Sequence, residues 1–335
     1  MGVLANGIPT RGQVGGVSAA GMTAPVLSVI IPTMGVRPEI LRAVATIQAQ
    51  VAVPCLALVV VNGNRYDPRL VARLEADPAV RVIRTPVPGV SHARLLGVRH
   101  VETPFFSLLD DDDELLPDCL APVMEAFEAG ADVVATNGLM ETDGNLGVKH
   151  ANLTAYGDDH ALALLHENWA TAGGLYCRAA GVPVELFEGL PNYMELTQLG
   201  MRMTMRCRIS RIDCKTFILH EGAAEQATKS LAYLRAEPGV MSNIASEVAR
   251  RDVRAVLRRK RSAALHDCAE FELAQQNIGR AWRDHIASML GGGGLRYASY
   301  TRHLVRGTLA AAVRALRPVP VPEGAAGPVA GGPDV

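Results

Sequence analysis

The chain has 335 residues, of which 49% are hydrophobic, 20% are charged and 4% are aromatic, and its formal net charge is -1. This length allows one large domain or two ordinary ones, each with a substantial core. The near-neutral charge argues against a nucleic-acid-binding protein, which carries a basic excess that offsets phosphates. The high hydrophobic content and low net charge argue against a disordered chain.

Cysteine usage and the start of the chain indicate a cytoplasmic protein. The six cysteines are scattered without a C-x-x-C pair, which argues against a disulfide framework and against a zinc site. Residues 1–24 form a Gly-, Ala- and Thr-rich leader that lacks the basic and apolar regions of a signal peptide, and we expect it to be flexible. The longest apolar run, at 51–61, contains Pro54 and is shorter than the roughly 20 residues of a membrane span.

Strand-like and helix-like segments alternate in the first half of the chain. The continuous apolar run at 26–31 is typical of a strand that is buried on both faces of a parallel sheet. After it we predict helix 38–50, strand 56–61, helix 68–76, strand 80–84, helix 91–101, strand 105–109, helix 117–129 and strand 132–136. Repeated β-α units of this spacing predict a three-layer α/β/α arrangement. Ligands of such sheets bind at the carboxyl ends of the strands.

The second half is less regular and then becomes helical. We predict helices at 159–167 and 193–205 and strands at 209–212 and 216–219. Residues 237–317 have helical patterns and contain 14 basic against 7 acidic residues. The Pro-, Gly- and Ala-rich segment 318–335 is expected to be a disordered tail. The predicted organisation is therefore one domain at 25–235, with halves at 25–137 and 138–235, followed by a helical extension at 236–317.

Five consecutive carboxylates, residues 110–114, follow the predicted strand at 105–109. These like charges repel one another, and the dipole of a following helix offsets only part of that cost. Side chains at positions i and i+2 share a face in an extended chain, so Asp110 and Asp112 can point together. Oxygen ligands of this kind favour hard cations such as Mg²⁺ or Mn²⁺. The alternative is a solvated acidic first turn of the helix that begins near Pro117.

Four ordered motifs resemble the family 2 glycosyltransferases, which are inverting enzymes with the GT-A fold. They are the strand and loop at 28–33, the Asn-Gly turn at 60–64, the helix start at 89–97 and the acidic strand end at 108–113. The resemblance covers about residues 26–220 and implies a Rossmann-like α/β/α fold with a mixed, mostly parallel sheet. It also implies a hexosyltransferase that moves a sugar from a nucleotide-diphosphate donor, with UDP-sugars expected first, to a hydroxyl acceptor. That acceptor would belong to a polysaccharide, a glycolipid or a secondary metabolite.

The resemblance also implies roles for individual residues. Asp112 and His220 would hold a Mn²⁺ or Mg²⁺ ion, which would stabilise the leaving diphosphate as a Lewis acid. The nucleotide sugar would contact Pro32, Thr33, Asn62, Arg94, Asp110 and Asp111. Asn62 stands where the family usually has an aspartate, and its alternative is a plain Asn-Gly turn after a strand. The alternative for Arg94 is a surface ion pair.

An inverting transfer needs a base that takes the proton of the acceptor hydroxyl. The family often supplies it from an E-D-x-x-L-x-x-R helix start, which the chain matches at Glu195, Leu199 and Arg202 but not at Leu196. Glu195 is therefore the candidate catalytic base, with Glu185 or Glu188 as alternatives. The missing aspartate also supports a second hypothesis, a catalytically inactive GT-A protein that binds a nucleotide sugar or a partner.

Arginines recur along the helical extension, at 250–261 and again at 302–317. This pattern fits a packed helical appendix with a solvated Arg face or a contact in a homodimer. It also fits an amphipathic surface on anionic lipid at the inner face of the membrane, where a lipid-linked acceptor would lie.

Overall fold

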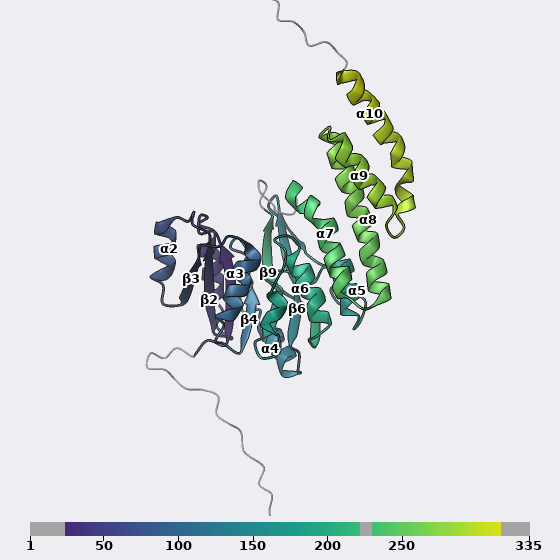
Figure 1. The fold of residues 1–335 in the computed structure, drawn as a ribbon. Coiled ribbons are helices and arrows are strands. Elements are labelled where there is room, and N and C mark those ends of the chain that lie inside the picture. Colours follow the sequence, from purple (N-terminus) through teal and green to yellow (C-terminus); the bar gives the residue numbers. More distant parts are fainter. Residues whose placement is uncertain (1–23, 222–229, 316–335) are drawn as a thin grey trace, which may run out of the picture. The chain divides into compact units, whose positions relative to one another are not determined.

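The structure is a computed structural model that describes residues 24–221 and 230–315 (Figure 1). The chain forms two compact units, Met1–Lys260 and Arg261–Val335. The predicted leader before Ala24 and the predicted tail at 318–335 lie outside the described residues.

The described part of the first unit contains one sheet of nine strands, in the order β3-β2-β1-β4-β8-β6-β9-β5, with β7 paired to β6. The first four strands in this order are parallel, and β8 is antiparallel to both of its neighbours, β4 and β6. β9 is parallel to β6, and β5 is antiparallel to β9. The strands are β1 (Leu27–Thr33), β2 (Cys55–Asn62), β3 (Val80–Thr85), β4 (Phe105–Leu108), β5 (Glu114–Leu115), β6 (Val133–Thr142), β7 (Asn145–Val148), β8 (Leu175–Arg178) and β9 (Ile209–Glu221).

Two hydrophobic clusters form the core, one on each face of the sheet. Ile30 belongs to the cluster with α3 (Val90–Arg99), α5 (His160–Glu167), α6 (Glu195–Thr204) and α7 (Leu231–Glu247). Val29 and Ile31 belong to the other, with α1 (Ile40–Gln48), α2 (Pro68–Glu75) and α4 (Ala121–Glu128). Successive residues of β1 thus point to opposite faces, and all seven are buried, which explains the continuous apolar run in the sequence.

The predicted α/β/α fold with a mixed, mostly parallel sheet is confirmed, and the helices and strands predicted up to residue 136 are present with shifted ends. β5, β7, β8 and the 3₁₀ helix η1 (Val184–Phe187) were not predicted. The two strands predicted at 209–212 and 216–219 are one strand, β9. The register of its pairing with β6 shifts on either side of Asn137. This irregularity of the β-bulge type interrupts the pattern of the strand, which is why the sequence predicts two strands.

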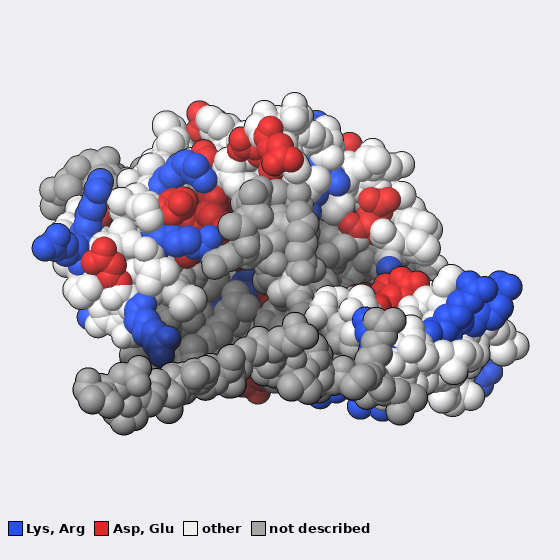
Figure 2. Space-filling model, turned by 90° about the horizontal axis from the view of Figure 1, so that it is seen from above, with Lys and Arg blue, Asp and Glu red and all other residues white. Residues whose placement is uncertain are grey.

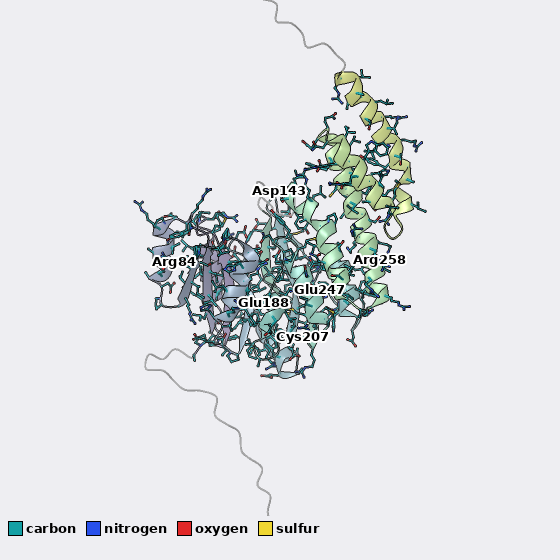
Figure 3. The ribbon with its side chains drawn as sticks, viewed as in Figure 1. Arg84, Asp143, Glu188, Cys207, Glu247 and Arg258 are labelled. Carbon is teal, nitrogen blue, oxygen red and sulfur yellow. The ribbon has the colours of Figure 1, made fainter. Side chains whose placement is uncertain are left out.

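The first unit extends beyond residue 236, where the sequence predicted the helical extension to begin. Val240, Met241 and Ile244 of α7 belong to the same core cluster as the inner face of α6. Glu247 of α7, labelled in Figure 3, forms an ion pair of 2.8 Å with Arg202 of α6. The division between the units falls inside α8 (Arg251–Ala274).

The second unit contains the end of α8, α9 (Ile278–Met289), the 3₁₀ helix η3 (Gly294–Tyr300) and α10 (Thr301–Ala315). Trp282 of α9 donates a hydrogen bond of 2.9 Å to the hydroxyl of Thr308 on α10. Gly307 lets α10 approach α8 closely, because a Cβ there would lie 2.6 Å from Leu273 Cδ1. Among the helices of the described residues, none combines the length and the apolar sequence that a membrane span requires.

Candidate active site

The carboxyl ends of β1, β2 and β4 meet at one edge of the sheet. Pro32 is buried in β1 opposite Val60 of β2, and Thr33 ends the strand. The backbone N–H of Leu109 donates to the carbonyl of Ile30, which places the acidic run directly beyond the sheet. Figure 2 looks onto the molecule from above and shows Asp and Glu side chains next to Lys and Arg side chains on this face.

Asn62 uses both ends of its amide within the protein. Its Nδ2 donates to the carbonyl of Thr33 at 2.8 Å, and its Oδ1 accepts from the backbone N–H of Gly89 at 3.0 Å. The side chain is 6% exposed, so these bonds are shielded from water. Asn62 therefore ties the end of β1 to the start of α3, and this role needs an amide because an aspartate cannot donate.

We predict that Asn62→Asp, although it restores the residue usual in the family, destabilises this protein by about 1–3 kcal/mol. A carboxylate would face the carbonyl oxygen of Thr33 with no donor between them. Urea denaturation measures the effect, and Asn64→Asp at the exposed neighbouring position is the control. Equal midpoints for the two variants would contradict this role of Asn62.

The five carboxylates of the acidic run have different partners. Asp111 accepts a hydrogen bond of 2.6 Å from the Thr33 hydroxyl, and Asp112 lies 3.3 Å from Arg37. Asp113 accepts from the backbone N–H of His220 at 3.1 Å, and Glu114 pairs with Arg42 at 2.8 Å. Asp110 pairs with Arg94 at 2.6 Å.

Burial raises the pKa of three of these carboxylates, because the nearby positive charge does not fully compensate for their removal from water. It raises the pKa of Asp111 and of Asp112, against the opposing effect of Arg37. Burial, reinforced by the charges of Asp110 and Asp112, raises the pKa of Asp113 to about 8. The electrostatics of the run therefore favour the arrival of a cation.

Arg94 joins the acidic run to the start of α6. Its guanidinium is 2% exposed and forms ion pairs with Asp110 and with Glu195. Burial lowers the pKa of Arg94, but the two carboxylates outweigh that effect and raise it. α3 can present Arg94 this deeply because Gly97 lets the helix approach β1, where a Cβ would lie 2.4 Å from Ile30 Cγ2. Arg94 is buried, so the predicted alternative of a surface ion pair is wrong. We call Arg94 with its two carboxylate partners, Asp110 and Glu195, the Arg94 fork.

Glu195 lies in the first turn of α6, after Met194, whose φ of +57° is in the left-handed region. Leu196 stands where the family usually has an aspartate, and it packs against the hydrophobic core. Tyr233, which the sequence did not indicate as a site residue, lies near Glu195, and Tyr193 contacts Tyr233. Burial, then the charges of Glu237 and Glu195, raises the pKa of Tyr233, and its ring meets Tyr193 edge-on at 6.1 Å between centroids.

His220 has both ring nitrogens engaged by carboxylates. Nδ1 lies 2.6 Å from Glu141 and Nε2 lies 2.8 Å from Glu114. A metal ligand needs a free lone pair on one ring nitrogen, so a metal ion bound by His220 would have to replace one of these two carboxylates. His220 is one of the groups that oppose the rise in the pKa of Asp112, so it lies near that carboxylate, and its role as a metal ligand stays a prediction. No cluster of three or more His, Cys, Asp or Glu side chains that could hold a metal occurs among residues 24–221 and 230–315.

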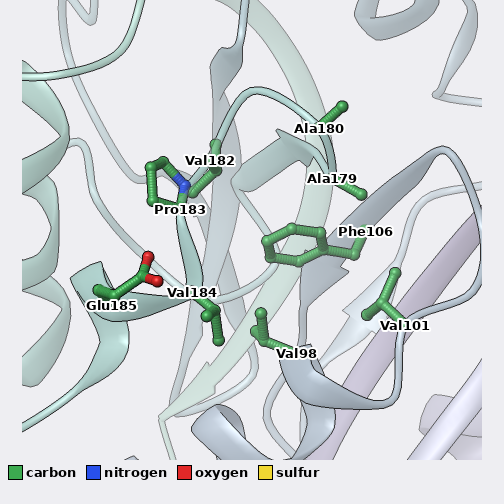
Figure 4. A pocket seen from close by; sticks show the side chains of 9 residues that line it. All are labelled: Val98, Val101, Phe106, Ala179, Ala180, Val182, Pro183, Val184 and Glu185. Carbon is green, nitrogen blue, oxygen red and sulfur yellow. The ribbon is translucent and has the colours of Figure 1, made fainter.

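The alternative bases lie elsewhere. Glu188 pairs with Arg99 at the carboxyl end of α3 at 2.7 Å. Glu185 lines a cavity of about 390 Å³ whose other lining residues are all apolar, among them Val98, Val101 and Phe106 (Figure 4). This cavity lies toward the start of β4, and it offers no set of polar groups for a diphosphate. Glu195 is the candidate base that the structure brings to the acidic run.

Comparisons with known proteins agree with the fold. Residues 28–180 match the model of the family described as Glycosyl transferase family 2. No curated protein matches the chain. Among solved structures, TarS 1–349 of S. aureus in complex with UDP-GlcNAc is 16% identical, with a TM-score of 0.54 over 78% of this chain and 81% of that chain.

Two further TarS structures are similar to the chain. The 1–349 segment, in a structure whose description names no ligand, has a TM-score of 0.54 at 16% identity over 83% of this chain and 91% of that chain. TarS in a longer form has a TM-score of 0.52 at 15% identity over 86% of this chain and 53% of that chain. At such identities the similarity shows the shared fold, which is the GT-A fold that the sequence predicted.

Proposed function

We propose that the chain, whose residues 28–180 match glycosyl transferase family 2, is a metal-dependent inverting glycosyltransferase that uses a nucleotide-diphosphate sugar and a hydroxyl acceptor. The buried fork of Arg94 is the observation that carries this proposal. It joins Asp110, on the proposed donor side, to Glu195, on the proposed acceptor side. A donor and an acceptor bound on the two sides of this fork would lie next to each other.

The donor side consists of the strand ends. Thr33 and Arg37 hold Asp111, which leaves its carboxylate at the end of β1 where a ribose hydroxyl could bind. A UDP-sugar is the proposed donor, since the TarS segment of similar fold was crystallised with UDP-GlcNAc. Both terminal nitrogens of Arg94 pair with carboxylates, and the side chain is 2% exposed, so we do not assign it a contact with the donor phosphates.

Asp112 is the proposed ligand of Mg²⁺ or Mn²⁺. Its side chain is 35% exposed, and its partner Arg37 is itself exposed and can move away. Mg²⁺ is commonly bound by one or two carboxylates together with substrate phosphates, so a complete cage of protein ligands is not required. Such an ion would stabilise the charge that develops on the leaving diphosphate.

Glu195 is the proposed base. Its Oε1 pairs with Arg94, and its second carboxylate oxygen can take the proton of an acceptor hydroxyl. The hydroxyl oxygen then attacks the anomeric carbon from the face opposite the diphosphate. The bond between that carbon and the diphosphate oxygen breaks, and the configuration at the carbon inverts. Tyr233 lies near this carboxylate and contacts Tyr193, and both rings would border the acceptor.

We predict that the Mn²⁺ complex of UDP stabilises the protein by about 2.7 kcal/mol when it is present at a hundredfold excess over its dissociation constant. UDP alone should give a smaller effect, because the charge of the diphosphate would then face the acidic run without a cation. Thermal shift assays measure both. Asp112→Ala should lose the Mn²⁺-dependent part, whereas Asp143→Ala, in the turn between β6 and β7, should keep it. The same shift in wild type and Asp112→Ala would contradict the metal site.

A further inference from the structure

The second unit carries an apolar stripe on the outer side of α10. Val305, Leu309 and Val313 are 43%, 61% and 57% exposed and recur every four residues, which places them on one side of the helix. The inner side is defined by Leu304, which is fully buried, and by Thr308, which is bonded to Trp282. The stripe is therefore not part of the packing among the residues of this unit that the structure describes.

The turn that precedes α10 is also unusually apolar. Leu290 and Leu295, on either side of the glycines between α9 and η3, are 83% and 80% exposed. They are among the most exposed large hydrophobic side chains in the described part of the chain. Scattered single residues of this kind are ordinary, but several within one short segment indicate a surface that binds something.

The charge of residues 285–315 indicates what kind of surface they bind. Residues 285–315 contain four arginines and no aspartate or glutamate. Arg302 and Arg306 are exposed on α10, one turn apart and next to the stripe. In a two-fold dimer this surface would face its own copy, so arginine would meet arginine with no acidic residue of the segment to pair with it. An anionic surface would complement the positive charge of these arginines.

We propose that the stripe of α10 and its arginines dock the second unit onto an anionic lipid surface. The helix would lie in the plane of the interface, with Val305, Leu309 and Val313 among the acyl chains and the guanidinium groups at the lipid phosphates. Arginine suits this position because its stem is apolar while its head stays hydrated. The inference does not depend on the transfer reaction, so either can fail without the other.

The test is sedimentation of the full chain with vesicles of phosphatidylcholine alone or with about 30% phosphatidylglycerol, whose anionic headgroups attract basic segments. We expect partitioning into the anionic vesicles that falls with added salt. Arg306→Gln should reduce the partition coefficient about fivefold. The double variant Leu309→Glu/Val313→Glu should reduce it by at least about tenfold.

A matched control is the double variant Leu146→Glu/Val148→Glu on β7, where the two side chains are 57% and 52% exposed. It should partition like wild type, and circular dichroism shows whether each variant is folded. Absence of binding at low salt would overturn the proposal, as would equal losses in the two double variants. A dimer in light scattering that is lost in Leu309→Glu/Val313→Glu, without vesicle binding, would also overturn it and assign the stripe to a second copy.

Discussion

Glu195→Gln is expected to lower kcat about 100- to 10,000-fold, the usual contribution of a general base. The glutamine can still accept a hydrogen bond from Arg94, so the start of α6 should keep its position, but an amide cannot take the proton of the acceptor. The affinity for the donor should be nearly unchanged, because the donor binds on the other side of the Arg94 fork. Initial rates at saturating donor, together with titration of UDP, separate the two quantities.

Glu188→Gln is the matched control for this substitution. Glu188 also forms an ion pair with an arginine of α3, at 2.7 Å, but it lies away from the acidic run. Its kcat should equal that of wild type. A fast Glu195→Gln enzyme would show that another group is the base, whereas a wild-type protein that binds UDP and never turns over would support the inactive nucleotide-sugar-binding hypothesis.

Arg94→Met is expected to destabilise the protein by about 3 kcal/mol, near the lower end of the cost of breaking a buried ion pair. Asp110 and Glu195 would lose their common counter-charge, although Asp110 is 42% exposed and water would screen part of its charge. Arg94→Lys should recover little of the loss, because a single ammonium cannot bridge two carboxylates as a planar guanidinium does. The urea midpoint at constant slope measures both variants.

Arg99→Met is the control for Arg94→Met, since Arg99 lies on the same helix and pairs with Glu188 while both side chains are half exposed. An exposed pair contributes about 0–1 kcal/mol. If Arg94→Met were as stable as Arg99→Met, the fork would not be the element that holds the two sides of the site together.

The strand ends of the site could be predicted from the sequence because their signals are local. The apolar runs that become β1, β2 and β4 are mostly buried strands that pair in parallel with one another, and such strands bring their carboxyl ends to one edge. This rule brings the strand ends that carry Thr33, Asn62 and the acidic run to one edge, and the family resemblance selected these residues as site candidates. The GT-A fold, which was predicted from the same segments, is confirmed, and residues 28–180 match the model of the predicted family.

The contacts between these side chains could not be predicted, because they depend on segments with weak local signals. His220 meets Glu114 and Glu141 through β5 and β6, and β5 has two residues and no pattern of its own. Arg94 meets Glu195 only after β8 and η1 have led the chain back to α3. The mismatch at Leu196 showed that an acid was missing, but not that the leucine packs against the core.

The most direct test of the central claim is UDP release from a panel of UDP-sugars, with and without Mn²⁺, by the wild-type chain and by Asp112→Ala. We predict that wild type releases UDP in the presence of Mn²⁺, and that EDTA and Asp112→Ala each abolish the release. Release of UDP at the wild-type rate by Asp112→Ala would contradict the assignment of donor chemistry to the acidic run at the end of β4.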